Sequence, residues 1–324
     1  MLAPLPRYWT GFDVLSNALG YGPLGFLITL GGLRSRRARP LLLAVGMAFG
    51  LSLMMESLQS YLPSRVPSNV DLFLNAMGGT VGAMAAWALE RLGALDRWTL
   101  FRARWFVPES RGALVLLALW PVGLLFPAAV PLGLGQVMER VEEGLADWLA
   151  DTPLLDWLPV RDVELQPLIP SAELLCVALG VLVPCLLAYS IVRSLPRRLA
   201  MLVLVLGVGL GFTALSAALS YGPVHAWSWL SLPVQLGLVL AVLLALPSLW
   251  LTRRGCAALC LLALGIHLSI LNQSPTSAYF AQTLQTWEQG RFIRFNGLAQ
   301  WVGWLWPYAA LVYLVSWMAR REPV

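Results

Sequence analysis

Residues 171–192 read SAELLCVALGVLVPCLLAYSIV, a run whose one charged side chain, Glu173, lies near its start. A helix needs about 20 apolar residues to cross the hydrocarbon core of a bilayer. The run meets that length. It therefore predicts a transmembrane helix.

The composition of the whole chain agrees with this prediction. Of 324 residues, 58% are hydrophobic and 12% are charged, whereas about 25% are charged in ordinary globular domains. Such a composition excludes a disordered chain, a coiled coil and a nucleic-acid-binding domain. It also argues against a soluble enzyme and favours a polytopic membrane protein.

Eight further stretches have a similar length and apolarity. The sequence thus predicts an all-α, polytopic transmembrane helical bundle of about nine spans. These spans are 12–33, 40–62, 70–92, 112–134, 171–192, 199–220, 232–252, 255–273 and 298–318.

The arginines predict the orientation of these spans. Sixteen of the 22 basic residues, all of which are arginine, fall in loops on one side of a nine-span arrangement, and six fall on the other. Because cytoplasmic loops carry the excess of basic residues, the arginine-rich side is predicted to be cytoplasmic. The N-terminus then lies outside and the C-terminus inside.

The longest outer loop, residues 135–170, has the pattern of an amphipathic helix. Val137, Val141, Leu145 and Trp148 recur at helical spacing among acidic side chains. This pattern predicts a helix that lies on the outer membrane surface. Its acidic face is interpreted as a solvated face in preference to a cation site.

Polar side chains cluster near the outer ends of the first three predicted spans. DVLSNALG (13–20) and DLFLNAMG (71–78) share Asp, Asn, Ala and Gly in register. Positions i, i+4 and i+7 lie on one face of a helix, so each copy presents its polar residues together. The predicted cluster comprises Asp13, Asn17, Glu56, Gln59, Arg65, Ser68, Asp71 and Asn75.

A structural role for these residues is the alternative to a functional one. An Asp near a helix start complements the helix dipole, and Asn between membrane helices can form a packing hydrogen bond. Glu56 is less well explained in this way, because it lies near a C-terminal helix end, where the dipole disfavours an anion. The cluster as a whole is therefore interpreted as a site.

The pattern E-x-x-Q…R…S-x-x-D-x-x-x-N-x-x-G over 56–78 resembles the VanZ-like membrane protein family. The match covers about residues 10–92 and includes Asp13, although the Lys and His of the family's usual opening are absent. We therefore divide the chain into a VanZ-like three-helix unit, 1–111, and an additional six-helix membrane module, 112–324. The resemblance implies a multi-pass protein of the bacterial inner membrane with a cell-envelope role, in a family named for resistance to the glycopeptide teicoplanin.

The last outer loop interleaves aromatic and basic residues. Trp287, Arg291 and Arg294 could contact a lipid head group. An aromatic belt with snorkelling arginines is the favoured alternative. His225 and His267 have no carboxylate neighbour in the sequence and are interpreted as packing or interfacial residues.

Three functions stay open at this point. The first is binding or handling of an envelope lipid or a lipid-linked saccharide at the outer leaflet. The second is a membrane enzyme with a desolvated carboxylate as its base, and the third is a non-catalytic scaffold. We expect membrane lipid as the partner, and no nucleic acid. The motifs point to no cofactor, and cysteine spacing points to no metal.

Overall fold

The computed structural model describes residues 11–61, 69–150, 152–153, 165–275 and 297–320. Within these ranges every regular element is a helix, and one isolated bridge joins Phe106 to Val192. The all-α prediction is confirmed. The chain divides into two compact units, Met1–Arg104 and Trp105–Val324.

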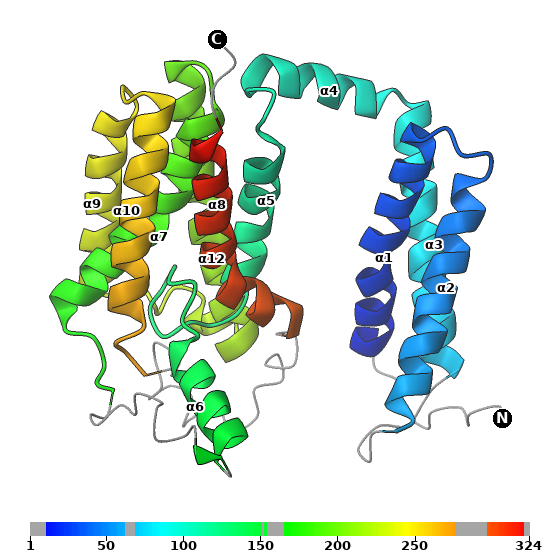
Figure 1. Ribbon diagram of the computed structural model, residues 1–324, viewed down its shortest axis with the longest axis horizontal. Helices are drawn as coiled ribbons and strands as arrows, with labels where there is room; N and C mark the ends of the chain where they lie inside the picture. The colour runs from blue at the N-terminus through cyan, green and yellow to red at the C-terminus, as the bar shows by residue number, and fades with distance from the viewer. Residues whose placement is uncertain (1–10, 62–68, 151, 154–164, 276–296, 321–324) are drawn as a thin grey trace. The chain divides into compact units, whose positions relative to one another are not determined.

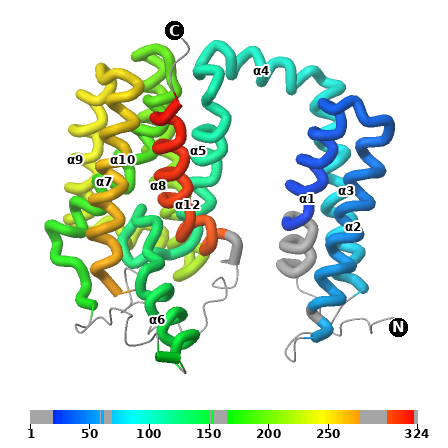
Figure 2. The backbone as a smooth tube through the Cα atoms, in the orientation of Figure 1, coloured from blue at the N-terminus to red at the C-terminus, as the bar shows by residue number. Residues whose placement is uncertain are grey.

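The first unit is a bundle of three long helices (Figure 1). Each of the three contacts the other two, and the contact between the first and third is the most extensive. Their bounds are α1 Gly11–Arg34, α2 Pro40–Gln59 and α3 Asn69–Arg91, and α4, Ala94–Trp105, follows them. The backbone trace shows how short the turn between α1 and α2 is (Figure 2).

The second unit is built around α7, Pro170–Ile191, which contacts four other helices. Every residue from Cys176 to Ile191 is buried, so this helix forms the axis of the hydrophobic core. The surrounding helices are α5 Arg111–Leu124, α8 Leu195–Tyr221, α9 Leu232–Ser248, α10 Arg253–Leu271 and α12 Gly297–Ala319, which packs on α5 and α10.

The helices agree with a multi-pass membrane protein. Among the described residues, six helices are long and apolar enough to cross a membrane: α2, α3, α7, α8, α10 and α12. The other three predicted spans coincide with α1 and with two shorter apolar helices, α5 and α9. The number of spans and their orientation stay predictions.

The predicted span 112–134 is wrong in its second half. The helix ends at Leu124, and residues 125–137 belong to no helix. Pro127 and Pro131 explain the break, since proline lacks a backbone N–H and disfavours helix in the residue before it. Gly135 adds a positive φ of 97°, a conformation that favours glycine.

This non-helical segment lies inside the second unit, where residues 130–136 are all buried. Gly180 of α7 leaves room for it: a Cβ there would meet the carbonyl oxygen of Leu132 at 2.6 Å. Buried backbone must find hydrogen-bond partners. The Gly135 N–H donates to the Gly303 carbonyl of α12 at 2.9 Å, and Tyr308 Oη donates to the Gly135 carbonyl at 3.1 Å.

The predicted amphipathic helix in the loop 135–170 corresponds to α6, Met138–Leu149. Val141, Leu145 and Trp148 are exposed along it, and none of its residues is buried in the protein. An exposed apolar stripe opposite acidic side chains is typical of a helix at a membrane interface.

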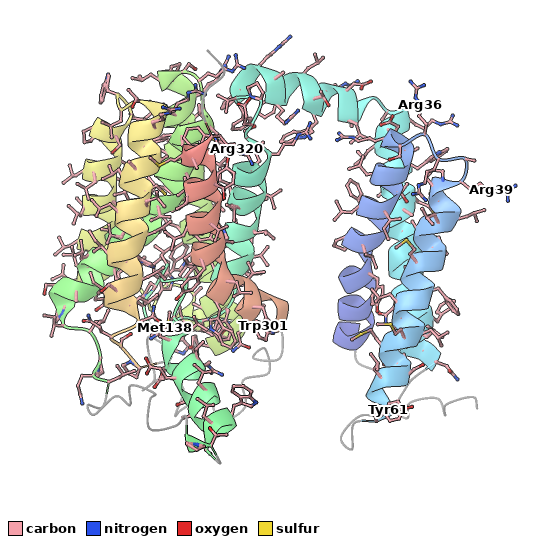
Figure 3. All side chains as sticks on the ribbon, viewed as in Figure 1. Arg36, Arg39, Tyr61, Met138, Trp301 and Arg320 are labelled. Atoms are coloured by element: carbon pink, nitrogen blue, oxygen red, sulfur yellow. The ribbon has the colours of Figure 1, made fainter. Side chains whose placement is uncertain are left out.

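Figure 3 labels residues at both ends of each unit. Arg36 and Arg39 lie at one end of the first unit, and Tyr61 lies at the other. In the second unit, Arg320 lies at one end, and Met138 and Trp301 lie at the other. Within each unit this agrees with loops that alternate between an arginine-rich and an arginine-poor side.

Candidate functional site

The site begins with the narrow buried stripe of α2. Ala44, Ala48, Ser52 and Glu56 are buried at intervals of four residues, and the large apolar side chains between them are exposed. A spacing of four residues keeps side chains on one helix face. Glu56, 9% exposed, therefore occupies the protein-facing stripe of a helix whose other faces are apolar and uncovered.

The facing stripe of α3 supplies the second half of the site. Asn75, 7% exposed, donates from Nδ2 to Ser52 Oγ at 3.0 Å. This hydrogen bond fixes the register of the two helices. Because α2 and α3 are antiparallel neighbours, Glu56 and Asp71 each lie one turn beyond this pair, toward the same end of the bundle.

One acceptor in this layer is unused. Asn75 Oδ1 is buried and has no hydrogen-bond partner among the described residues. A buried carbonyl oxygen without a partner costs about 1–3 kcal/mol. The hydrogen-bonding capacity of Asn75 is therefore only partly used within the described part of the first unit.

Glycines bring α1 and α3 together beside this layer. A Cβ at Gly25 would collide with the Gly79 backbone, and a Cβ at Gly82 would collide with the Gly22 backbone. Close backbone approach through small residues is a common way for helices to associate in membranes. The glycine of the motif, Gly78, is also buried on this helix.

The structure describes part of the predicted cluster. Ser52 was not among the predicted residues; its signal is the four-residue spacing to Glu56.

Asp13, Asn17 and Gln59 lie in α1 and α2, but their side chains are outside what the structure describes, as are Arg65 and Ser68. The predicted head-group contacts Trp287, Arg291 and Arg294 also lie outside the described residues.

The chemistry that this layer can offer is hydrogen bonding and one or two carboxylates. Glu56 and Asp71 supply the carboxyl groups, Ser52 a hydroxyl and Asn75 an amide. Within the described ranges, no group of three or more His, Cys, Asp or Glu side chains could hold a metal ion. The arrangement suits a ligand rich in hydroxyl groups.

A second polar network, which the sequence analysis missed, holds the buried segment of the second unit. Gln136 Nε2 donates to the Ser274 carbonyl at 2.8 Å and to Ser274 Oγ at 2.9 Å. Asn272 Oδ1 accepts from the N–H groups of Val137 and Met138 at 3.1 and 3.0 Å. The sequence signal was the density of Pro and Gly in PAAVPLGLGQ, residues 127–136.

The histidines behave differently from each other. His267 is buried, and its Nδ1 lies 3.1 Å from the Cys176 carbonyl oxygen of α7, so it packs in the core. His225 is half-buried, in the short 3-10 helix Pro223–His225, with Nδ1 3.4 Å from Ser228 Oγ. All four cysteines are buried and free.

Comparison with known proteins bears on the first unit. Residues 2–90 match the model of the VanZ/LLP1 family, which covers α1, α2 and all but the last residue of α3. No curated protein and no solved structure matches the chain. The chain is therefore a multi-pass helical membrane protein whose N-terminal segment, residues 2–90, is VanZ-like.

Proposed function

We propose that this protein binds an envelope lipid or a lipid-linked saccharide at the outer leaflet of the bacterial inner membrane. The ligand would contact the polar layer of α2 and α3, with Glu56 and Asn75 as its principal contacts. Ser52 orients Asn75 through their hydrogen bond. Asp71 lies one turn nearer the end of the bundle, where a head group would enter.

The observation that supports this proposal is the content of the one buried stripe of α2. The large side chains exposed on this helix are Leu, Met and Phe, whereas the buried stripe ends in Ser52 and Glu56. Ionisable and polar groups inside a membrane are costly and usually face a bundle interior where they have a function. The unused Asn75 Oδ1 offers an acceptor for a sugar hydroxyl.

The test is ligand retention by the purified full-length protein in nanodiscs. A labelled polyprenyl-phosphate-linked saccharide is added, and bound label is measured per mole of protein. We expect stoichiometric retention by the unchanged protein. Glu56→Gln and Asp71→Asn keep the shape of each side chain and remove its charge, so each should lower retention by about tenfold, as expected for one charge-assisted hydrogen bond.

Ser57→Ala is the matched control. Ser57 follows Glu56 directly, is exposed, and its Oγ donates to the Leu53 carbonyl of its own helix. We expect its retention to equal that of the unchanged protein.

Three results would contradict the proposal. If both acidic variants retain as much ligand as the unchanged protein, the cluster does not take part in binding. Turnover of the labelled substrate would replace a binding protein with an enzyme that uses the same carboxylates. Failure of both variants to fold would favour a scaffold in which the cluster is structural.

A further inference from the structure

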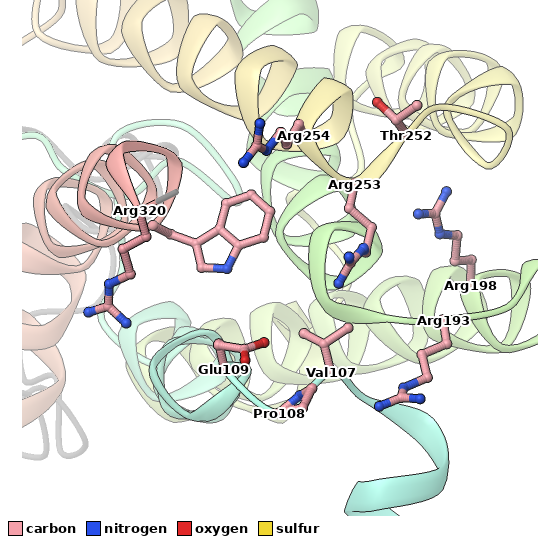
Figure 4. A pocket seen from close by; sticks show the side chains of 10 residues that line it. Val107, Pro108, Glu109, Arg193, Arg198, Thr252, Arg253, Arg254 and Arg320 are labelled. Carbon is pink, nitrogen blue, oxygen red and sulfur yellow. The ribbon is translucent and has the colours of Figure 1, made fainter. Parts of the chain in front are cut away.

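A second site lies in the other unit, in a basic pocket at its arginine-rich end (Figure 4). The pocket has a volume of about 810 Å³. It collects side chains from four places that are distant in the sequence: the segment before α5, the turn from α7 into α8, the start of α10 and the end of α12. Five lining residues are arginines, namely Arg193, Arg198, Arg253, Arg254 and Arg320.

Two of these arginines are fixed in place by the backbone. Arg193 Nε donates to the Phe106 carbonyl at 3.1 Å. Arg198 is 7% exposed, and one of its η-nitrogens donates to the Leu249 and Leu251 carbonyls at 2.7 Å each, which satisfies the end of α9. A guanidinium carries five N–H donors, so both retain others for a ligand.

The Nε nitrogen of Arg198 is a further feature of the pocket. It is buried and has no hydrogen-bond partner among the described residues. A buried donor of a charged group is expensive to leave unpaired. Arg198 therefore brings a buried cation with one unsatisfied donor to the wall of the pocket.

The charge balance of the pocket calls for an anion. Among the described residues that line it, one is acidic, Glu109, and five are arginines. The pocket also includes the start of α10, where Thr252 Oγ1 caps the Gly255 N–H at 3.0 Å. The dipole of this helix adds positive potential at its N-terminus.

The geometry points to a binding site for a ligand with a phosphate or diphosphate group. Guanidinium groups pair with phosphate through two parallel hydrogen bonds, and several arginines favour a polyanion over a single charge. The volume is in the range of small-molecule sites, which is about 300–1,000 Å³. Val107, Pro108 and Trp317 form a less polar wall that would contact the rest of the ligand.

A phosphate group can come from an anionic phospholipid or from a soluble phosphate compound, and the experiment has one arm for each. In the first arm, calorimetry measures pyrophosphate binding to the full chain in nanodiscs of phosphatidylcholine. In the second arm, native mass spectrometry measures phosphatidylglycerol retained by the full chain after purification in detergent.

The test variant is Arg254→Gln with Arg320→Gln, because both side chains line the pocket and are exposed. The matched control is Arg97→Gln with Arg104→Gln on α4, two exposed arginines outside the pocket whose loss changes the net charge equally. We expect the test variant to lose at least about tenfold in affinity for the ligand that binds. The control should lose less than about twofold.

Glu109→Gln provides a test with the opposite sign. Removing the Glu109 carboxylate should strengthen binding by about threefold to tenfold, and this test applies even if the double variant does not fold.

Pyrophosphate binding that depends on Arg254 and Arg320 supports a soluble ligand, and phosphatidylglycerol retention that depends on them supports a lipid. Equal losses of affinity in the test and control variants would mean that binding depends only on net charge, and this would overturn the proposal. Absence of binding in both arms, or no gain with Glu109→Gln, would also overturn it.

Discussion

Helices α2 and α7 have nearly the same length and both are strongly apolar, yet they have opposite surroundings. In the most apolar stretch of α7, 89% of the residues are buried inside the protein, whereas in that of α2 the share is 17%. The surface of α7 is covered by apolar side chains from four neighbouring helices. The single buried stripe of α2 ends in Ser52 and Glu56.

This difference shows that apolarity identifies a membrane helix without saying what surrounds it. Lipid tails are as apolar as leucine, so burial of leucine against protein is not itself the force that joins helices in a bilayer. The first unit is joined by close backbone approach at glycines and by the hydrogen bond from Asn75 to Ser52. The second unit is joined by dense side-chain packing around α7 and by a buried non-helical segment.

The largest expected effect tests packing directly. Leu186 of α7 is fully buried, and Leu53 of α2 is 48% exposed. We expect Leu186→Ala to lower the free energy of unfolding by about 2–5 kcal/mol, because it leaves a cavity. Leu53→Ala should change it by less than about 1 kcal/mol, since acyl chains refill the space.

Unfolding of both variants in detergent micelles with rising sodium dodecyl sulfate measures these changes. Hydrogen exchange assigns each change to one unit. Equal losses at the two positions would mean that α2 is covered as completely as α7.

A smaller effect is expected from the glycine contact of the first unit. Gly82→Ala places a methyl group against the Gly22 backbone, so α1 and α3 must separate. We expect a loss of about 1–3 kcal/mol, confined to the first unit. Hydrogen exchange of α1 and α3 measures it.

Gly46→Ala on α2 is the matched control, since a Cβ there meets nothing within 4 Å. Because alanine favours helix over glycine, this variant should be neutral or up to about 1 kcal/mol more stable. A Gly82→Ala protein that exchanges like the control would contradict the close contact of α1 with α3.

Much of this architecture could be predicted from the sequence, because long apolar runs have few alternatives in a membrane. The polar stripe of α2 and α3 was predictable in part for the same reason: Glu56, Asp71 and Asn75 stand out in an apolar setting. Ser52 does not stand out, since serine is common in membrane helices. Its importance depends on which face of α2 is buried, and that is a property of the packing.

The non-helical segment 125–137 was not predicted, because hydropathy averages over backbone shape. Leu125, Val130 and Leu132 are as apolar as any helix residue. Gly180, Asn272 and Gly303, which are far along the chain, supply space and hydrogen bonds for the segment. The basic pocket was missed for a related reason: arginines that appear as topology signals in separate loops converge in space.

The smallest effect on stability is expected from a change in the polar layer of α2 and α3. Asn75→Leu removes the hydrogen bond to Ser52, and such bonds between membrane helices average about 0.6 kcal/mol. It also removes the unpartnered Oδ1, which offsets part of that loss. We therefore expect the free energy of unfolding to change by less than about 1 kcal/mol, while retention of the labelled lipid-linked saccharide is lost.

Ser52→Ala breaks the same hydrogen bond and leaves both polar atoms of Asn75 in place, so it is the control for this variant. It should retain more ligand than Asn75→Leu at similar stability. If Asn75→Leu instead unfolds the first unit as Leu186→Ala destabilises the second, the polar stripe of α2 and α3 serves the same purpose as the apolar core around α7. Unchanged retention would show that Asn75 does not contact the ligand, because a site does not use an acceptor that can be deleted without effect.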